Sequence, residues 1–238
     1  MQGRPTGIRQ AVTALFLGSA FALYAYSLLL TDVARALLLF YVTPVWSTIL
    51  EVALMGRRFT KARALALVLG FGGLLTILGG RSGIPLPRNL GDTMAIVAGI
   101  LWACGAVRVR TSKDISVFEH VFSFFLYGGA VAFLLALLPI KGASILPSWA
   151  QLGPLVPWLL LVALGFLIPV TCALLWGSQR IDPGRLGILL QLEAVVGIAS
   201  AALLTDEPFG LVEVAGTILI IGAGVVDVLG SETRAGQF

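Results

Sequence analysis

Apolar stretches long enough to cross a lipid bilayer follow one another along almost the whole chain. A membrane-spanning helix needs about 20 mostly apolar residues, each adding about 1.5 Å of rise. Only 12% of the 238 residues are charged and the mean hydropathy is +0.98, whereas soluble domains carry about 25% charged residues. We therefore expect an all-α integral membrane protein, a polytopic bundle of about eight transmembrane helices. The eight stretches cover residues 11–30, 34–54, 62–79, 91–107, 119–138, 153–176, 186–204 and 210–229.

The placement of the basic residues predicts the orientation of this bundle. Of the 16 Lys and Arg residues, 12 fall in segments on the N-terminal side of the membrane, and the other four are Arg35, Arg81, Arg88 and Lys141. Cytoplasmic loops are enriched in Lys and Arg. We expect a multi-pass protein of the inner (plasma) membrane with both termini in the cytoplasm. Because the basic residues are distributed by loop and form no single patch, nucleic acid is not an expected partner.

A second constraint is an internal repeat. When the chain is shifted by about 150 residues against itself, the segment 31–80 aligns with the segment 181–230 without a gap. The matched positions include polar, aromatic and glycine residues. Two unrelated apolar helices share hydropathy, but this alone would not align such residues at one fixed shift. The identical pairs include Asp32 with Asp182, Arg35 with Arg185, Phe59 with Phe209, Gly72 with Gly222 and Gly80 with Gly230.

The repeat predicts an inverted architecture. The first copy begins at the first span and the second copy at the sixth, so an odd number of spans separates them and corresponding helices should cross the membrane in opposite directions. Inverted-topology repeats are typical of transporters that alternate between inward-open and outward-open forms around a site near the midplane.

The same comparison predicts two repeat units of unequal length. The second copy is preceded by the spans 91–107 and 119–138, whose counterparts would lie before Met1. We expect a parent architecture of five plus five helices in which this chain starts two helices late. Residues 1–80 would form a partial first unit of three helices, and residues 91–230 a second unit of five.

No residue pattern indicates enzymatic chemistry, a cofactor or a metal. The sequence has one histidine, and it contains neither a Cys-x-x-Cys nor a His-Glu-x-x-His motif nor a phosphate-binding glycine loop. The two cysteines, Cys104 and Cys172, both fall inside predicted spans. We therefore expect a protein that is not an enzyme and needs no cofactor.

Ionisable groups within membrane spans are costly and therefore informative. Glu193 lies well inside its predicted helix. It is either a carboxylate that couples transport to protons or recognises a cation, or a structural carboxyl bonded to Trp, Tyr or backbone neighbours. Glu51, near the basic loop, is expected to pair with Arg57 or Arg58.

Six further residues are candidates for the lining of a central cavity. Tyr41, Pro44 and Thr48 share one face of the second span, where Pro44 should kink or open the helix. The repeat places Gln191 at the position of Tyr41. These groups either line a cavity or make interhelical hydrogen bonds, and the aromatic side chains at mid-depth are either cavity walls or packing. The full set of substrate-binding candidates is Tyr24, Tyr41, Pro44, Thr48, Trp102, Gln191 and Glu193.

Two sequence motifs resemble the EamA-type unit of the drug/metabolite transporter superfamily. The first is ARALLLFYVTPVWSTIL, followed by a charged turn and a helix that ends in glycines. The second is LLQLEAVVGIASAALLTDEPFG, which leads into GTILIIGAG. The resemblance implies ten helices, a central cavity, and transport of small organic solutes. It assigns Tyr41 and Pro44 to one cavity helix, Gln191 and Glu193 to its counterpart, and Trp102 to the helix that opens the second unit. Ala194 stands where this family commonly has a proline, so we expect the second cavity helix to be less kinked.

The expected function is secondary transport of small organic solutes by alternating access, with protons as a possible coupling ion and the lipid bilayer as the surroundings. One alternative is a non-transporting truncated fragment or a regulatory membrane protein, which would show no saturable solute flux in liposomes. A membrane-embedded enzyme is a further alternative, and it would require a polar catalytic cluster.

Overall fold

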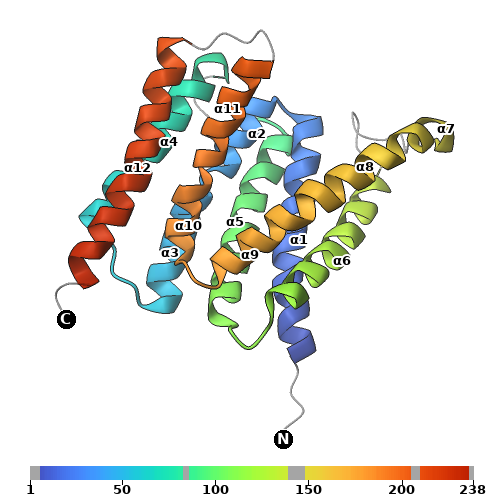
Figure 1. Ribbon diagram of the computed structural model, residues 1–238, viewed down its shortest axis with the longest axis horizontal. Helices are drawn as coiled ribbons and strands as arrows, with labels where there is room; N and C mark the ends of the chain where they lie inside the picture. The colour runs from blue at the N-terminus through green and yellow to red at the C-terminus, as the bar shows by residue number, and fades with distance from the viewer. Residues whose placement is uncertain (1–5, 83–85, 139–147, 205–209, 236–238) are drawn as a thin grey trace, which may run out of the picture.

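The computed structural model describes residues 6–82, 86–138, 148–204 and 210–235. This part of the chain is a bundle of helices without strands, and the last helix of the chain packs along α4 rather than beside its neighbours in sequence (Figure 1). The helices are α1 (Thr6–Leu30), α2 (Val33–Phe40), α3 (Thr43–Met55), α4 (Lys61–Ser82), α5 (Leu90–Thr111), α6 (Val117–Ala136), α7 (Trp149–Leu152), α8 (Val156–Val162), α9 (Ile168–Ser178), α10 (Pro183–Leu190), α11 (Leu192–Leu204) and α12 (Leu211–Ala235).

The expected fold class, a polytopic helical membrane bundle, is confirmed. Within the described residues, seven helical segments are long and apolar enough to cross a membrane. Two of these segments combine several elements: α2 and α3 form one, and the stretch from α7 through α9 forms another, with a 3₁₀ turn at Gly153–Leu155 and a π-helical turn at Ala163–Leu167. The predicted span 186–204 corresponds to α10 and α11 and is not among the seven. The exact number of spans stays a prediction.

The helix bounds follow the shift of about 150 residues found in the sequence. Helices α2 and α10 cover residues that correspond one to one under this shift, and α4 and α12 begin at corresponding residues. Helices α2 and α3 follow one another as one segment, and α10 and α11 as another. The chain runs in opposite directions through these two segments (Figure 1). The start of α1 and the end of α12 lie at the same end of the bundle.

The segments α2–α3 and α10–α11 are each interrupted in the middle. Helix α2 ends at Phe40 and α3 begins at Thr43, with Pro44 in its first turn, where the missing N–H of proline costs no helical hydrogen bond. The interruption therefore lies at Tyr41 and Val42, just before the proline. In the corresponding segment, α10 and α11 are separated by Gln191 alone. The second interruption is thus one residue long and the first is two residues long. The smaller kink expected from Ala194 stays a prediction.

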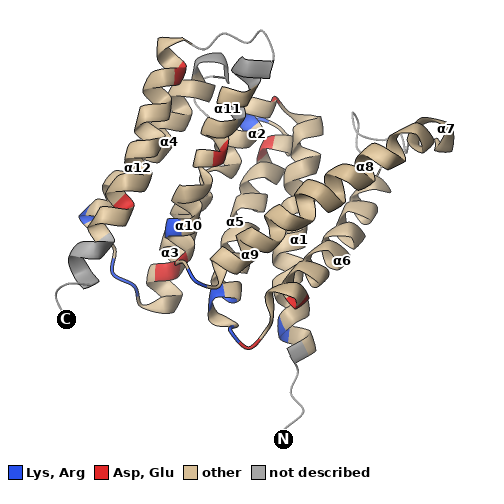
Figure 2. Cartoon of the chain, in the orientation of Figure 1, with Lys and Arg blue, Asp and Glu red and all other residues tan. Residues whose placement is uncertain are grey.

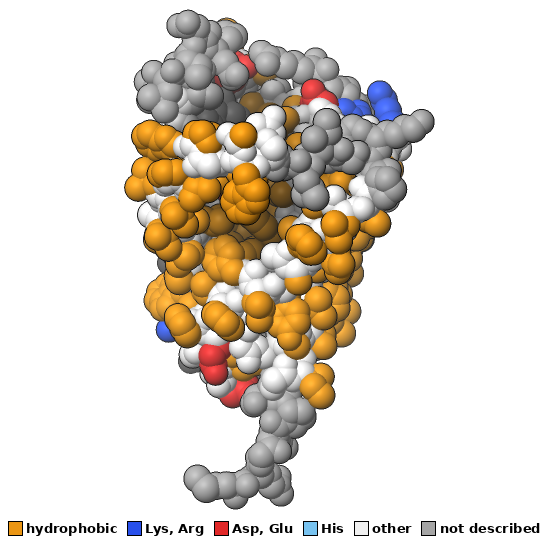
Figure 3. Space-filling model, turned by 90° about the vertical axis from the view of Figure 1, so that its right-hand side faces the viewer, with side chains coloured by type: hydrophobic (Ala, Val, Ile, Leu, Met, Phe, Trp, Pro, Cys, Tyr) orange, Lys and Arg blue, Asp and Glu red, His pale blue; other side chains and the backbone are white. Residues whose placement is uncertain are grey.

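Large apolar side chains cover the outside of the bundle, as expected for a surface that faces lipid. On α8, for example, Trp158 and Leu161 are 67% and 61% exposed. Figure 3 shows such a face, which is mostly hydrophobic and is hollowed near its middle.

The interior is built on close helix contacts that only small side chains permit. Helix α1 packs against both α5 and α6. At Gly18 of α1, an added Cβ would lie 2.7 Å from the Cα of Gly128 on α6 and 3.1 Å from the carbonyl oxygen of Phe124. The obstructing atoms are backbone atoms, so they cannot rotate away. Small residues at crossings let transmembrane helices approach in this way.

Substituting Gly18 with Ala should therefore separate α1 from α6. We expect Gly18→Ala to lower the free energy of unfolding by about 1–3 kcal/mol, the usual cost of overpacking, measured as a fall in Tm in detergent. The control is Gly129→Ala, because an added Cβ at Gly129 meets no atom within 4 Å. Equal Tm values for the two variants would contradict the assigned crossing.

Charged residues gather toward the ends of the helices (Figure 2). Two ion-pair clusters, one buried and one partly buried, hold these ends together. At one end, Nη2 of Arg35 on α2 lies 2.5 Å from Oδ2 of Asp92 on α5. At the other, Asp227 on α12 accepts from Nε of Arg63 and Nε of Arg185, both at 3.2 Å. The repeat relates Arg35 to Arg185, so corresponding arginines bind carboxylates at opposite ends of the bundle.

The polar contacts of Glu51 differ from the expected ones. Its Oε2 accepts from the backbone N–H of Gly184 on α10 at 3.0 Å, whereas the guanidinium of Arg57 lies 3.1 Å from Asp182. No ion pair in the described part of the chain joins Glu51 to Arg57 or Arg58, so the predicted pairing of Glu51 with Arg57 or Arg58 was wrong. Instead, Glu51 joins α3 to α10 by capping the start of α10, because helix N-termini favour a carboxylate.

Candidate functional site

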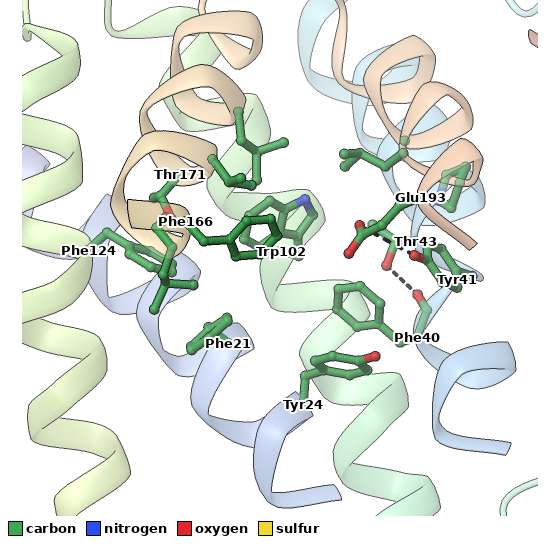
Figure 4. Close-up of a pocket in the computed structure, with 16 residues that line it drawn as sticks. Phe21, Tyr24, Phe40, Tyr41, Thr43, Trp102, Phe124, Phe166, Thr171 and Glu193 are labelled. Carbon is green, nitrogen blue, oxygen red and sulfur yellow. Dashed lines mark hydrogen bonds between the residues drawn. The ribbon is translucent and has the colours of Figure 1, made fainter. Parts of the chain in front are cut away.

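A cavity of about 200 Å³ lies where the two broken helices face α1, α5, α6 and α9. Its volume is small beside the 300–1,000 Å³ of typical ligand pockets. Figure 4 shows the lining side chains. They are Phe21, Tyr24, Phe40, Tyr41, Thr43, Pro44, Trp102, Phe124, Phe166, Leu167, Val170, Thr171, Leu174, Gly187, Leu190 and Glu193.

The helix interruptions place two polar groups at this cavity. Tyr41 is the first residue of the interruption between α2 and α3, and Glu193 lies in the first turn of α11, which follows the interruption at Gln191. The Tyr41 hydroxyl donates to Oε2 of Glu193 over 3.5 Å (Figure 4). The two interrupted segments, α2–α3 and α10–α11, therefore contribute one member of this pair each.

Six of the other 14 lining residues are aromatic. The ring centroids of Tyr24 on α1 and Phe40 on α2 lie 4.5 Å apart, and those of Phe40 and Tyr41 lie 5.8 Å apart in an edge-to-face arrangement. Phe21 and Phe124 make a further edge-to-face contact at 5.6 Å. These spacings lie within the range of favourable aromatic pairs, so the walls are packed against one another.

Five of the seven candidates named from the sequence line the cavity, and two do not. The five are Tyr24, Tyr41, Pro44, Trp102 and Glu193. Thr48 is buried between α3 and α10, near Gly184. Gln191 is 2% exposed and packs against Gly70 of α4.

Sequence reasoning missed most of the apolar lining. Phe40 and Thr43 flank the interruption, and their position beside Tyr41 and Pro44 was an available signal. Phe124 and Phe166 carried no such signal, because an apolar residue in a membrane helix looks the same whether it faces lipid or a cavity. Thr171 was also not among the candidates.

Charge is concentrated on one side chain of this cavity. Among the described residues that line it, Glu193 alone is charged, and none is Lys, Arg or His. The hydroxyl groups of two lining threonines are engaged within their own helices, where Thr43 donates to the carbonyl of Phe40 and Thr171 to that of Leu167. The described part of the chain contains no cluster of His, Cys, Asp or Glu that could hold a metal ion.

Comparison with known proteins finds one family. The chain matches the EamA-like transporter family over residues 2–79 and 89–226.

Two curated relatives come from enteric bacteria. A "probable amino-acid metabolite efflux pump" of Salmonella typhimurium strain LT2 is 28% identical over 149 residues, which are 60% of this chain and 50% of the relative. The protein of the same name from Escherichia coli strain K12 is 27% identical over 150 residues, or 61% of this chain and 50% of the relative. The chain thus spans about half the length of the curated relatives it matches.

A similar fold is known from experiment. One crystal structure matches 95% of this chain with a TM-score of 0.73 and 23% identity, and the match covers 76% of the other chain. At this identity the likeness supports the fold alone.

Proposed function

Because the chain belongs to the EamA-like transporter family, we propose that it moves small organic metabolites across the inner membrane through the cavity lined by Tyr41 and Glu193. The observation that carries the proposal is that the cavity lies at the interruptions of two helices, one from each repeat. Discontinuous helices expose backbone groups and polar side chains at mid-depth, where transporters bind their substrates.

The mechanism we infer is alternating access between two inverted repeats, the first within residues 1–80 and the second within residues 91–230. Its support is the opposite direction of α2–α3 and α10–α11 and the recurrence of their bounds. The arginines that the repeat relates hold opposite ends of the bundle, through Asp92 at one end and Asp227 at the other. Releasing one cluster while keeping the other would open one end at a time.

The proposed orientation places both termini in the cytoplasm. The start of α1 and the end of α12 share one end of the bundle (Figure 1), and 12 of the 16 basic residues belong to segments expected on that side. The positive-inside rule then assigns that end to the cytoplasm.

Glu193 is the group we assign to proton coupling. Its carboxylate is exposed to the cavity and can bind and release a proton as the two ends open in turn. The titratable groups that face it are the hydroxyl of Tyr41, from the first broken helix, and that of Tyr24, from α1. Neither is positively charged, so neither holds Glu193 permanently as half of an ion pair.

Filling the cavity should block transport without unfolding the protein. Val170 on α9 lines the cavity, so we expect Val170→Trp to reduce saturable flux into proteoliposomes by about tenfold or more, because a bulky ring would occupy the binding space. The flux would be measured with a panel of radiolabelled amino acids and the amines derived from them.

The matched control for this test is Val162→Trp. Val162 is 55% exposed on α8 and is not part of the cavity lining, so its variant should transport at the wild-type rate. An absence of saturable flux in the wild-type protein would favour the alternative of a non-transporting membrane protein.

A further inference from the structure

The charge and shape of the cavity restrict what it can hold. A ligand in this space meets one carboxylate, that of Glu193, and no basic side chain among the described lining residues. A bound positive charge would be compensated there, whereas a bound negative charge would lie in an apolar site beside a like charge. Burying an uncompensated charge is strongly unfavourable.

Aromatic rings surround the same region. Seven of the 16 lining residues are Phe, Tyr or Trp, and the ring of Phe40 contacts the rings of both Tyr24 and Tyr41 close to the carboxylate. The faces of aromatic rings attract ammonium groups, and aromatic walls also pack well against an aromatic ligand body.

Hydrogen-bond donors for a ligand carboxylate are few. The hydroxyl groups of Thr43 and Thr171 donate to carbonyls of their own helices, and that of Tyr41 donates to Glu193. The other side-chain donors of the lining, the hydroxyl of Tyr24 and the indole N–H of Trp102, carry no positive charge. A zwitterionic amino acid would therefore find a partner for its ammonium group but no cationic partner for its carboxylate.

We propose that this cavity selects arylalkylamines, ligands with an aromatic body and a single ammonium group, over the amino acids from which such amines derive. The proposal rests on the proposed transport function, because it names the substrate class of the same cavity. The ammonium group binds between the Glu193 carboxylate and the ring faces of Tyr24 and Phe40, and the aromatic body lies toward Trp102 and Phe124.

The test uses three probes that share a phenyl ring and differ in charge. Binding of radiolabelled 2-phenylethylamine to the purified, detergent-solubilised protein is measured by scintillation proximity at pH 7. Unlabelled 2-phenylethylamine, phenylalanine and 3-phenylpropionate then compete with it. We expect phenylalanine and 3-phenylpropionate to compete at least about tenfold more weakly than the amine, which is the usual size of a lost charge-assisted interaction.

Two variants link this selectivity to Glu193. Glu193→Gln should weaken binding of 2-phenylethylamine by about tenfold or more. Glu119→Gln removes a carboxylate outside the cavity and should leave binding unchanged. Glu119 forms a capping box with Ser116 at the start of α6, and Gln serves equally well at that position, so the control preserves the helix.

Three results would overturn the proposal: equal competition by phenylalanine, unchanged binding in Glu193→Gln, or no binding of 2-phenylethylamine to folded wild-type protein. These outcomes are separable from a failure of the transport function. Saturable, Val170→Trp-sensitive flux of an amino acid would retain transport and reject the amine class. If the amine binds in a Glu193-dependent manner but no solute is transported, arylalkylamines remain the ligand class and the transport function is rejected.

Discussion

Replacing Glu193 with Gln is expected to make solute flux insensitive to an imposed pH gradient. Among the described residues that line the cavity, Glu193 has the only carboxylate, and Gln preserves its shape and its contact with Tyr41 but cannot bind or release a proton. If one proton moves for each solute, a gradient of one pH unit can sustain about a tenfold accumulation of the solute at equilibrium, and this accumulation should disappear in the variant. Slow downhill flux through the intact cavity should persist.

The measurement compares proteoliposomes with and without a transmembrane pH gradient, using the solute whose flux Val170→Trp blocks. Glu119→Gln again serves as the matched control and should respond like the wild type, because its carboxylate lies outside the cavity in the capping box of α6. A Glu193→Gln variant that keeps the full pH response would reject proton coupling through this residue.

The second large effect is expected at Asp92. Its side chain is fully buried, and its carboxylate binds the guanidinium of Arg35, the hydroxyl of Thr31 and the backbone N–H of Arg88. Asp92→Asn removes the negative charge opposite a buried guanidinium. Breaking one side of a buried ion pair typically costs 3–5 kcal/mol, so we expect a loss of about 3–5 kcal/mol of unfolding free energy.

Thermal unfolding in detergent provides the measurement, and Asp114→Asn is the control. Asp114 pairs with Arg9 over 3.7 Å, and its side chain is 51% exposed. Exposed pairs contribute about 0–1 kcal/mol, so Asp114→Asn should hardly change Tm. If the two variants unfold at the same temperature, the Arg35–Asp92 pair does not stabilise this end of the bundle. The double variant Arg35→Met/Asp92→Leu should recover part of the loss, because it removes both buried charges.

Much of the fold could be predicted from hydropathy and from the repeat. Long apolar runs place helices in the membrane, since every backbone polar group must be satisfied internally there. The shift that matches Asp32 with Asp182 also relates the bounds of α2 and α10. Pro44 indicated an interrupted helix, because proline has no backbone N–H to donate to a helical hydrogen bond.

Less of the candidate site could be predicted from the sequence. Tyr41 and Gln191 occupy corresponding positions and were both predicted to be polar members of the site. Tyr41 lines the cavity, whereas Gln191 packs against Gly70 of α4. Sequence position defines the face of a helix on which a residue lies. It does not define which neighbouring helix covers that face.

The amino-acid sequence was sufficient to establish an all-helical membrane protein, to predict an internal repeat and to single out Glu193 as an unusual carboxylate. These properties depend on local chemistry. A long apolar run favours a membrane-spanning helix, and a charged side chain within such a run is energetically costly. The tertiary structure alone decided that Tyr41 and Glu193 meet at one cavity and that Phe124 and Phe166 complete its wall. Lipid and protein interior are both apolar, so hydropathy cannot distinguish a side chain that faces one from a side chain that faces the other.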